Sequence, residues 1–147
     1  MILSNGDLDS FGIDVVMVDG SFDPIHNGHI EYFREASQLG FPVLCNVAPD
    51  SWTQNKHRVL LPVSQRVVVL DAIRYISFVT VSDISTAESL RKIRPKIYVK
   101  GSDWLSRGGI PAEEKEICEL HHIKVIYLNT LHNSSSSLLS NFSDKTA

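Results

Sequence analysis

Short apolar runs rich in β-branched residues alternate along this chain with segments of helical periodicity. Five of the runs are expected to form strands, at residues 13–20, 41–50, 77–83, 96–101 and 123–128. The run 41–50 is apolar almost throughout, which is typical of a strand buried on both faces of a parallel sheet. The alternation therefore predicts an α/β fold, in which a doubly wound five-stranded parallel sheet carries helices on both faces.

The segments between and after these runs carry helical spacing or helix-start signals. Asn27 is expected to be the N-cap of the first helix and Gly40 to end it. Ser85 and Glu88 form a capping-box pattern at the start of the third helix, and the polar stretch 50–58 is expected to be a loop. In a sheet of this kind ligands bind at the carboxyl ends of the strands, so functional residues are expected in the turns that follow them. The helices are expected at 27–40, 61–76, 85–94, 111–122 and 134–142.

Composition fits this fold and argues against several other classes of protein. The chain has 147 residues, of which 43% are hydrophobic and 21% charged, so we expect a single domain over residues 1–147 with its core at about 13–140. The net charge of −3 argues against a nucleic-acid partner. Cys45 and Cys118 lie in separate apolar runs, which favours buried thiols over a disulfide or a zinc site.

The sequence also predicts where the protein resides. No apolar run approaches the roughly 20 residues that span a bilayer. Residues 1–12 lack the basic and apolar regions of a signal peptide. We therefore expect a cytoplasmic protein that has no membrane partner.

The stretch GSFDPIHNGHI, residues 20–30, joins the first predicted strand to the first predicted helix. Unpaired backbone N–H groups and the helix dipole favour an anion at such a helix start. Gly20 and Gly28 leave room for a phosphate near the backbone, and the imidazoles of His26 and His29 can donate hydrogen bonds to it. From the residues alone, a zinc site and a turn with solvated histidines stay open beside the phosphate site.

The same stretch resembles the signature of the nucleotidyltransferase superfamily with a His-x-Gly-His motif, the cytidylyltransferase-like proteins. That signature consists of a glycine, a small residue, Phe-Asp, a few further residues and His-x-Gly-His. The second signature of the superfamily is a serine or threonine cluster that opens the last helix, and the run Ser134–Ser137 resembles it. The resemblance extends over about residues 13–140 and implies a Rossmann-like fold. It favours phosphate binding by the histidines over zinc binding.

Two further segments resemble particular branches of this superfamily. Residues 61–76 resemble the helix that carries an arginine in cytidylyltransferases and ADP-heptose synthases. Arg66 matches that arginine, and Lys56, in the preceding loop, matches a lysine of the family. Residues 94–104 resemble the ADP-heptose synthases in Val-Lys-Gly and the glycerol-3-phosphate cytidylyltransferases in their tryptophan. The latter enzymes carry an arginine where this chain has Thr130, which favours the ADP-heptose synthases.

The resemblance implies transfer of a nucleoside monophosphate from ATP or CTP to the phosphate of a sugar or polyol, with release of pyrophosphate. It implies catalytic roles for His26, His29, Lys56 and Arg66, which would bind and neutralise phosphates. Mg²⁺ is expected with the triphosphate, although no protein ligand is assigned to it, and a homodimer or larger assembly is compatible with the family. The residues expected to bind the nucleotide are Gly20, Ser21, Phe22, Asp23, His26, Gly28, His29, Lys100, Gly101, Asp103, Ser134, Ser135, Ser136 and Ser137.

Three other functions stay open at this point. A glycerol-3-phosphate-type cytidylyltransferase is the nearest alternative. Leu138 and Leu139 follow the serines without a nearby basic residue, which is compatible with a nucleotide-binding relative that lacks turnover. A purely structural α/β domain would bind no nucleotide. The sequence does not decide between ATP and CTP, and it does not name the acceptor.

Overall fold

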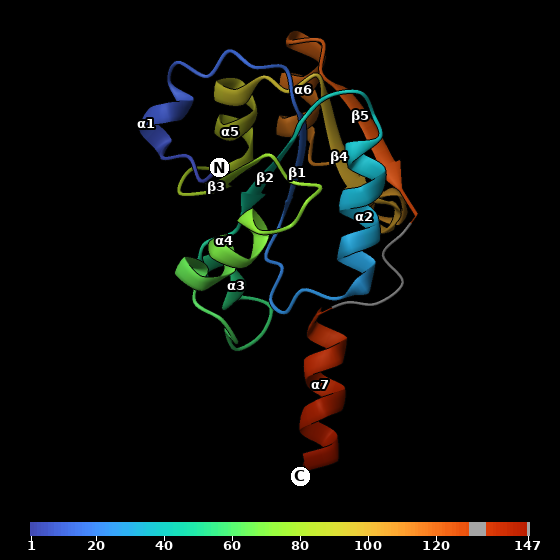
Figure 1. Cartoon of the computed structure of the whole chain (residues 1–147). Helices are drawn as coiled ribbons and strands as arrows, with labels where there is room; N and C mark the ends of the chain where they lie inside the picture. The colour runs from blue at the N-terminus through green and yellow to red at the C-terminus, as the bar shows by residue number, and fades with distance from the viewer. Residues whose placement is uncertain (130–134, 147) are drawn as a thin grey trace.

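The computed structural model describes residues 1–129 and 135–146, apart from the side chains at 136 and 144–146, and within these ranges five parallel strands form one sheet (Figure 1). The strands lie in the order β3-β2-β1-β4-β5, and every neighbouring pair is parallel. The predicted doubly wound, Rossmann-like sheet is therefore confirmed. The strand bounds are β1 (Val16–Gly20), β2 (Val43–Val47), β3 (Phe78–Val81), β4 (Ile97–Gly101) and β5 (Lys124–Leu128).

The strand order reverses next to the first strand. The chain runs outward from β1 to β2 and β3, then crosses back to place β4 and β5 on the other side of β1. The connections that follow β1 and β4 therefore leave the sheet in opposite directions and open a crevice at the carboxyl ends of these strands. The stretch GSFDPIHNGHI begins at this crevice, because β1 ends at Gly20.

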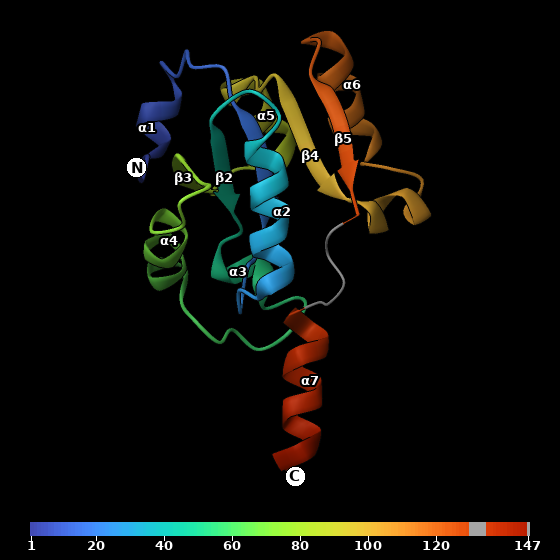
Figure 2. The same ribbon diagram turned by 45° about the vertical axis from the view of Figure 1, so that its right-hand side comes forward.

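Helices cover both faces of the sheet, as Figures 1 and 2 show. Val16 and Val18 of β1 belong to one apolar cluster, together with Phe33. Met17 belongs to a second cluster, together with Leu90. Neighbouring residues of a strand point to opposite faces, so a single strand supplies both cores. The first cluster lies under α2 (Asn27–Ser37) and α4 (Val63–Asp71), and the second under α5 (Thr86–Ile93) and α6 (Ala112–Leu120).

Two local predictions are wrong. The N-cap of α2 is His26, and Asn27 is the first helical residue, because the His26 side chain accepts a backbone N–H of the first turn. The stretch 50–58 was expected to be a loop, but its first residues form the short helix α3 (Asp50–Thr53). Backbone hydrogen bonds from Trp52 and Thr53 to the Pro49 carbonyl close this turn without any apolar periodicity. Two further short elements had no sequence signal, α1 (Asn5–Leu8) and the 3₁₀ helix η1 (Ser102–Arg107).

The segments at the two ends of the chain lie differently. The N-terminal segment packs along β3, where the Leu3 N–H donates to the Val79 carbonyl over 2.8 Å. Helix α7 (Ser135–Thr146) extends away from the sheet and its covering helices in both ribbon views (Figures 1 and 2). Cys45 and Cys118 are buried free thiols. None of the helices in the described ranges is long and apolar enough to cross a membrane.

Candidate active site

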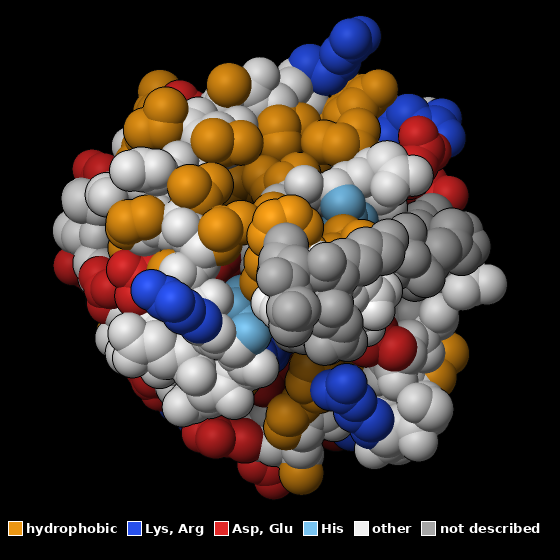
Figure 3. Space-filling view, turned by 90° about the horizontal axis from the view of Figure 1, so that it is seen from below, with side chains coloured by type: hydrophobic (Ala, Val, Ile, Leu, Met, Phe, Trp, Pro, Cys, Tyr) orange, Lys and Arg blue, Asp and Glu red, His pale blue; other side chains and the backbone are white. Residues whose placement is uncertain are grey.

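A cavity of about 1090 Å³ opens at the carboxyl ends of the strands. Figure 3 views the molecule from this side, where histidine and Lys or Arg side chains lie on the rim of a hollow. Asp23, His26 and Gly28 lie in the same turn without lining the cavity, and Arg66 does not line it either. The residues predicted from sequence that do line it are Gly20, Ser21, Phe22, His29, Lys56, Lys100, Gly101, Asp103, Ser135 and Ser137.

The two histidines hold each other and the first turn of α2 in place. The Gly28 N–H donates to Nδ1 of His26 over 3.1 Å, and the His26 N–H donates to Nδ1 of His29 over 3.2 Å. The two rings stack with their centroids 3.8 Å apart. Because each Nδ1 accepts a hydrogen bond, the neutral ring carries its proton on Nε2. The capping box thus gives both histidines the tautomer that donates through Nε2.

Burial keeps these rings neutral. It lowers the pKa of His29 to about 3, with a contribution from the nearby His26, and burial also lowers the pKa of His26. Nε2 of His26 is buried and has no hydrogen-bond partner among the described residues. A buried N–H donor without a partner is costly, which is why such a group is expected to serve a ligand. An anion at this turn would satisfy it.

Phe22 supports the histidine pair from below. Its ring contacts the ring of His29 edge-on, with the centroids 5.1 Å apart, and it also packs against Phe33 at 5.1 Å. The backbone of Phe22 is in the left-handed region, with φ 52°. A Cβ on Gly20 would lie 3.0 Å from Cζ of the Phe22 ring. The glycine that begins the motif is therefore required by the ring that holds His29.

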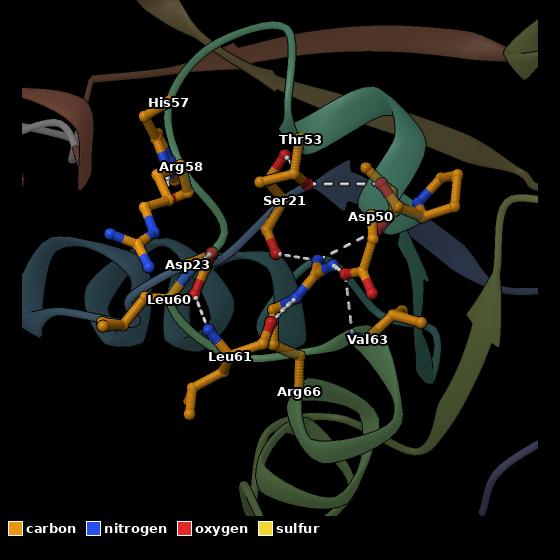
Figure 4. A network of polar contacts seen from close by, with 12 residues as sticks. Ser21, Asp23, Asp50, Thr53, His57, Arg58, Leu60, Leu61, Val63 and Arg66 are labelled. Atoms are coloured by element: carbon orange, nitrogen blue, oxygen red, sulfur yellow. Dashed lines mark hydrogen bonds and ion pairs between the residues drawn. The ribbon is translucent and has the colours of Figure 1, made fainter.

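A second set of polar contacts fixes the loop beyond β2 (Figure 4). Asp23 is fully buried, and its carboxylate accepts the N–H groups of Leu60 and Leu61 over 2.8 and 2.9 Å. The Ser21 hydroxyl accepts a hydrogen bond from Thr53 over 3.0 Å. The hydrogen bonds of Asp23 connect the histidine motif to the loop that carries Lys56. Asp23 thus orients this loop, and its carboxylate does not line the cavity.

Arg66 is a structural residue, contrary to the contact with phosphate that the resemblance implied. Its side chain is 1% exposed and forms an ion pair of 2.6 Å with Asp50. It also donates to the carbonyls of Ser21, Ala48 and Leu61 over 2.7, 2.9 and 2.9 Å (Figure 4). These contacts to the protein turn the guanidinium away from the cavity, which Arg66 does not line. The sequence could not reveal this, because the carbonyls come from three separate segments.

Two lysines supply positive charge to the cavity. Lys56 and Lys100 both line it, and partial burial followed by the charge of Lys100 lowers the pKa of Lys56. Nζ of Lys100 lies 2.7 Å from Asp19 and 4.3 Å from the centroid of the Trp104 ring. The same ring has the Arg107 guanidinium at 5.0 Å. An ion pair and a π-face thus hold Lys100 in place, whereas Lys56 has no described ion pair.

The serine cluster reaches the histidine turn from the far end of the chain. The Ser135 hydroxyl donates to the Pro24 carbonyl over 2.6 Å, although the two residues are 111 positions apart. Ser135 and Ser137 line the cavity with His29. Ser134 lies outside the described residues, and so does the side chain of Ser136. The two sequence signatures therefore meet at one cavity.

Several cavity residues were not predicted. Asp19, Tyr32, Asn46, Tyr98 and Glu114 are buried or half-buried polar members of this group. The alternation of side chains along the strands could have indicated them. Asp19, for example, lies two residues after Met17 and so points to the same face of the sheet. No motif marks these positions. The other polar or aromatic lining residues outside the predicted set are Ser51, Trp52, Asn55, His57, Ser82, Ser85, Thr86 and Trp104.

The sequence profile of the cytidylyltransferase-like proteins matches residues 17–141. The chain belongs to the cytidylyltransferase-like family. The family match and the relatives described next support a nucleotidyltransferase. The matched residues include the histidine turn, both lysines of the cavity and the serine cluster. This assignment favours a phosphate site at the histidine turn over a zinc site, and it favours a nucleotide-binding protein over a purely structural domain.

Curated relatives of this cytidylyltransferase-like chain differ in length. The Bifunctional protein HldE of Nitrosococcus oceani is 35% identical over 99 residues, which are 65% of this chain and 21% of that protein. The chain thus spans about a fifth of the length of this relative. The FAD synthase of Methanohalobium evestigatum is 29% identical over 135 residues, which are 90% of this chain and 86% of the synthase.

Solved structures share the fold. The lipopolysaccharide core biosynthesis protein from Thermoplasma volcanium superposes with a TM-score of 0.66 at 21% identity, over 81% of this chain and 98% of that one. A protein of unknown function from Archaeoglobus fulgidus superposes with a TM-score of 0.59 at 17% identity, over 83% of this chain and 93% of that one.

Proposed function

We propose that this chain transfers a nucleoside monophosphate from ATP or CTP to the phosphate of a sugar or polyol and releases pyrophosphate. The observation that carries the proposal is the pair of neutral Nε2–H donors fixed by the histidine capping box. One of them, on His26, is buried without a described partner. His29, Ser135 and two lysines line one cavity, and the His26 ring stacks on that of His29 beside it, so the pair lies at a site suited to polyphosphate.

The reaction needs positioning more than proton transfer. The acceptor phosphate carries its negative charge already at neutral pH, so one of its oxygens can attack the α-phosphorus without a general base. The new P–O bond forms as the bond between the α-phosphorus and the oxygen bridging to the β-phosphorus breaks, and pyrophosphate leaves with that oxygen. His26 and His29 would donate to phosphate oxygens whose charge increases in the transition state. A neutral donor suits this role, since it does not depend on protonation near pH 7.

The other predicted residues have distinct roles in this proposal. Lys56 would contact the phosphates from its loop, and Ser135 would hold them at the start of α7. Gly101 ends β4 and Asp103 lies in η1 directly after it, where both would approach the ribose or base. Arg66 would act only as a positioning residue, because its guanidinium is held by backbone carbonyls and Asp50.

Mg²⁺ belongs to the proposal as a companion of the triphosphate. Among the described residues, no three His, Cys, Asp or Glu side chains gather into a metal site. Asp19 lines the cavity, but its two carboxylate oxygens are engaged by Lys100 and Tyr98. This donor set does not form a protein cage for the ion. Mg²⁺ would therefore take most of its ligands from phosphate and water.

A pyrophosphate-release assay tests the proposal. Purified protein is incubated with each of ATP, CTP, GTP and UTP against sedoheptulose 7-phosphate, mannose 1-phosphate, ribose 5-phosphate, glycerol 3-phosphate, FMN and phosphopantetheine. We expect release with one nucleotide and a sugar or polyol phosphate. Release with FMN alone would instead favour the activity named in the FAD synthase relative, which aligns with 90% of this chain. Nucleotide binding without release in any pair would indicate a relative that lacks turnover.

A further inference from the structure

A row of polar side chains crosses the sheet on the face covered by α5 and α6. Thr80 of β3, Asn46 of β2 and Asp19 of β1 are register partners on neighbouring strands. Lys100 of β4 continues the row through its 2.7 Å ion pair with Asp19. Met17, Leu44 and Tyr98 each lie two residues before a member of this row, on the same face of the sheet, and they belong to the second apolar cluster. The row therefore lies where this cluster ends and the cavity begins. These four residues are named the polar row below.

Asn46 offers the cavity a hydrogen-bond donor. Asn46 is 2% exposed and lines the cavity. Its Oδ1 accepts a hydrogen bond from the Thr80 hydroxyl over 2.9 Å, which orients the amide. Its Nδ2 is buried and has no hydrogen-bond partner among the described residues. A buried amide of this kind loses the hydrogen bonds that water would give it, and a ligand with an acceptor oxygen would restore them.

Asp19 and Glu114 offer acceptors. The Tyr98 hydroxyl lies 2.8 Å from Oδ2 of Asp19 and 3.0 Å from Oε1 of Glu114. One hydroxyl carries a single proton, so it can donate to only one of the two carboxyl groups at a time. The second oxygen of Glu114 has no described partner of its own in these contacts. Carboxyl oxygens held close together in a cavity are suited to a ligand that brings several hydroxyl donors.

The part of the cavity lining that follows β3 is also rich in hydrogen-bonding groups. Ser82, Ser85 and Thr86 line the cavity between β3 and α5. Helix α5, which begins at Thr86, packs against α6, and Glu114 lies in the first turn of α6. The compartment therefore presents hydroxyls, an amide and carboxyl groups on its floor and wall. It extends across the sheet from β3 and β2 to β4, because Lys100 lies on β4 and Glu114 on the helix that follows it.

We propose that the polar row and Glu114 form the subsite that recognises the hydroxyl groups of a polyhydroxylated acceptor phosphate. Nδ2 of Asn46 donates to one hydroxyl of the substrate, Glu114 accepts from another, and the lone pairs of Asp19 that Lys100 and Tyr98 leave over accept from a third. The inference rests on the proposed function, because it places the carbon chain or ring of the acceptor in this compartment while its phosphate meets the α-phosphate near His29. These residues decide which acceptor reacts, and they leave the handling of the nucleoside triphosphate to other residues.

Paired acceptors test the subsite in the unmodified enzyme. Propyl phosphate carries the same phosphate as glycerol 3-phosphate and has no other hydroxyl. We expect the best of glycerol 3-phosphate, ribose 5-phosphate, mannose 1-phosphate and sedoheptulose 7-phosphate to exceed propyl phosphate in kcat/KM by about tenfold or more, since a site built for hydroxyls rejects analogues that lack them. Equal values for propyl phosphate and the best of the four would overturn the proposal.

Variants then identify the residues that form hydrogen bonds with the hydroxyl groups of the acceptor phosphate. Glu114→Gln and Asn46→Ala are compared with Glu113→Gln, an exposed glutamate in the same turn of α6. We expect Glu114→Gln and Asn46→Ala each to lower kcat/KM for the best polyhydroxylated phosphate about tenfold to hundredfold. The values for propyl phosphate and the KM of the triphosphate should stay within about twofold, and Glu113→Gln should match the unmodified enzyme. Where Asn46→Ala does not fold, as judged by thermal melting, Glu114→Gln carries the test.

Three outcomes contradict the subsite. An unchanged preference in Glu114→Gln excludes hydroxyl recognition by this group. An equal loss with propyl phosphate indicates a structural role only, and a raised KM for the triphosphate assigns the compartment to the nucleotide. These results differ from failure of the proposed function, in which no sugar or polyol phosphate reacts with any nucleotide in the unmodified enzyme.

Discussion

The backbone N–H of His26 donates to the ring of His29, and the two imidazoles stack with centroids 3.8 Å apart. Each ring therefore serves the helix through Nδ1 and keeps its Nε2–H for a ligand. The motif His-x-Gly-His combines a helix cap, formed through Nδ1 of each ring, with a pair of Nε2–H groups that we propose donate to phosphate. The glycine between the histidines supplies the N–H that His26 accepts, which explains why the spacing is as short as it is.

Replacing His29 by alanine should lower kcat for pyrophosphate release by about 10²- to 10³-fold, because the transition state loses a preorganised donor. The helix should stay folded, since α2 packs through Phe33 and Ala36 as well as through its cap. His122→Asn serves as the control, because His122 is exposed in the turn before β5. Circular dichroism checks the fold. An unchanged kcat for His29→Ala would be inconsistent with phosphate donation by this ring.

The stability of the protein should fall as the pH is lowered below about 6.5. Burial lowers the pKa of His29 to about 3 from its ordinary 6.5, so between these values the unfolded chain binds a proton that the folded chain does not. Stability therefore rises with pH across this window and is complete above it. Urea unfolding at several pH values measures the slope. The slope should be smaller in His29→Gln, and an identical slope in both proteins would contradict the assignment.

Arg66→Met should destabilise the fold by about 3–5 kcal/mol, because it leaves Asp50 without its buried ion-pair partner and removes the donors to three carbonyls. Urea unfolding measures the loss. Arg58→Met is the control, since Arg58 is exposed on the preceding loop. If Arg66 contacted the triphosphate instead, the variant would keep its stability and raise the KM for the nucleotide.

Gly20→Ala should destabilise the protein by about 1–3 kcal/mol and displace the Phe22 ring, which its Cβ would approach to 3.0 Å. Activity should fall with it, since this ring supports His29. Gly12→Ala is a matched substitution, because nothing lies within 4 Å of the added Cβ there. Thermal melting compares the two. Equal melting temperatures would show that the ring moves at no cost.

Lys56→Ala should raise the KM for the triphosphate about tenfold and change kcat less. The lysine reaches the cavity from a loop, so its positive charge attracts the triphosphate without orienting the reacting atoms. Lys96→Ala is the control, since Lys96 is exposed just before β4 begins, at the opposite end of the strand from the cavity. Steady-state kinetics at constant ionic strength checks both. A KM unaffected in Lys56→Ala would remove this lysine from the phosphate site.

The fold could be predicted in outline from local patterns. β-Branched runs alternating with helical spacing indicated each of the five strands of the described sheet, and the bounds differ by a few residues at the ends. The short helix at Asp50–Thr53 was missed because it has no apolar face to produce a period. The N-cap was placed one residue late, because His26 is not a usual capping residue and acts through a ring nitrogen.

The sequence by itself indicated the reaction class through its resemblance to a family signature, and it predicted a phosphate site at the strand-to-helix junction, because the histidine motif is a local feature. Tertiary structure decided the roles of Arg66, Asp19 and Asn46. Carbonyls from three segments hold the Arg66 guanidinium inside the protein. Asp19 and Asn46 become one polar row only when β1 and β2 pair in register. A residue's neighbours across a sheet depend on strand order and register, which no single stretch of sequence contains.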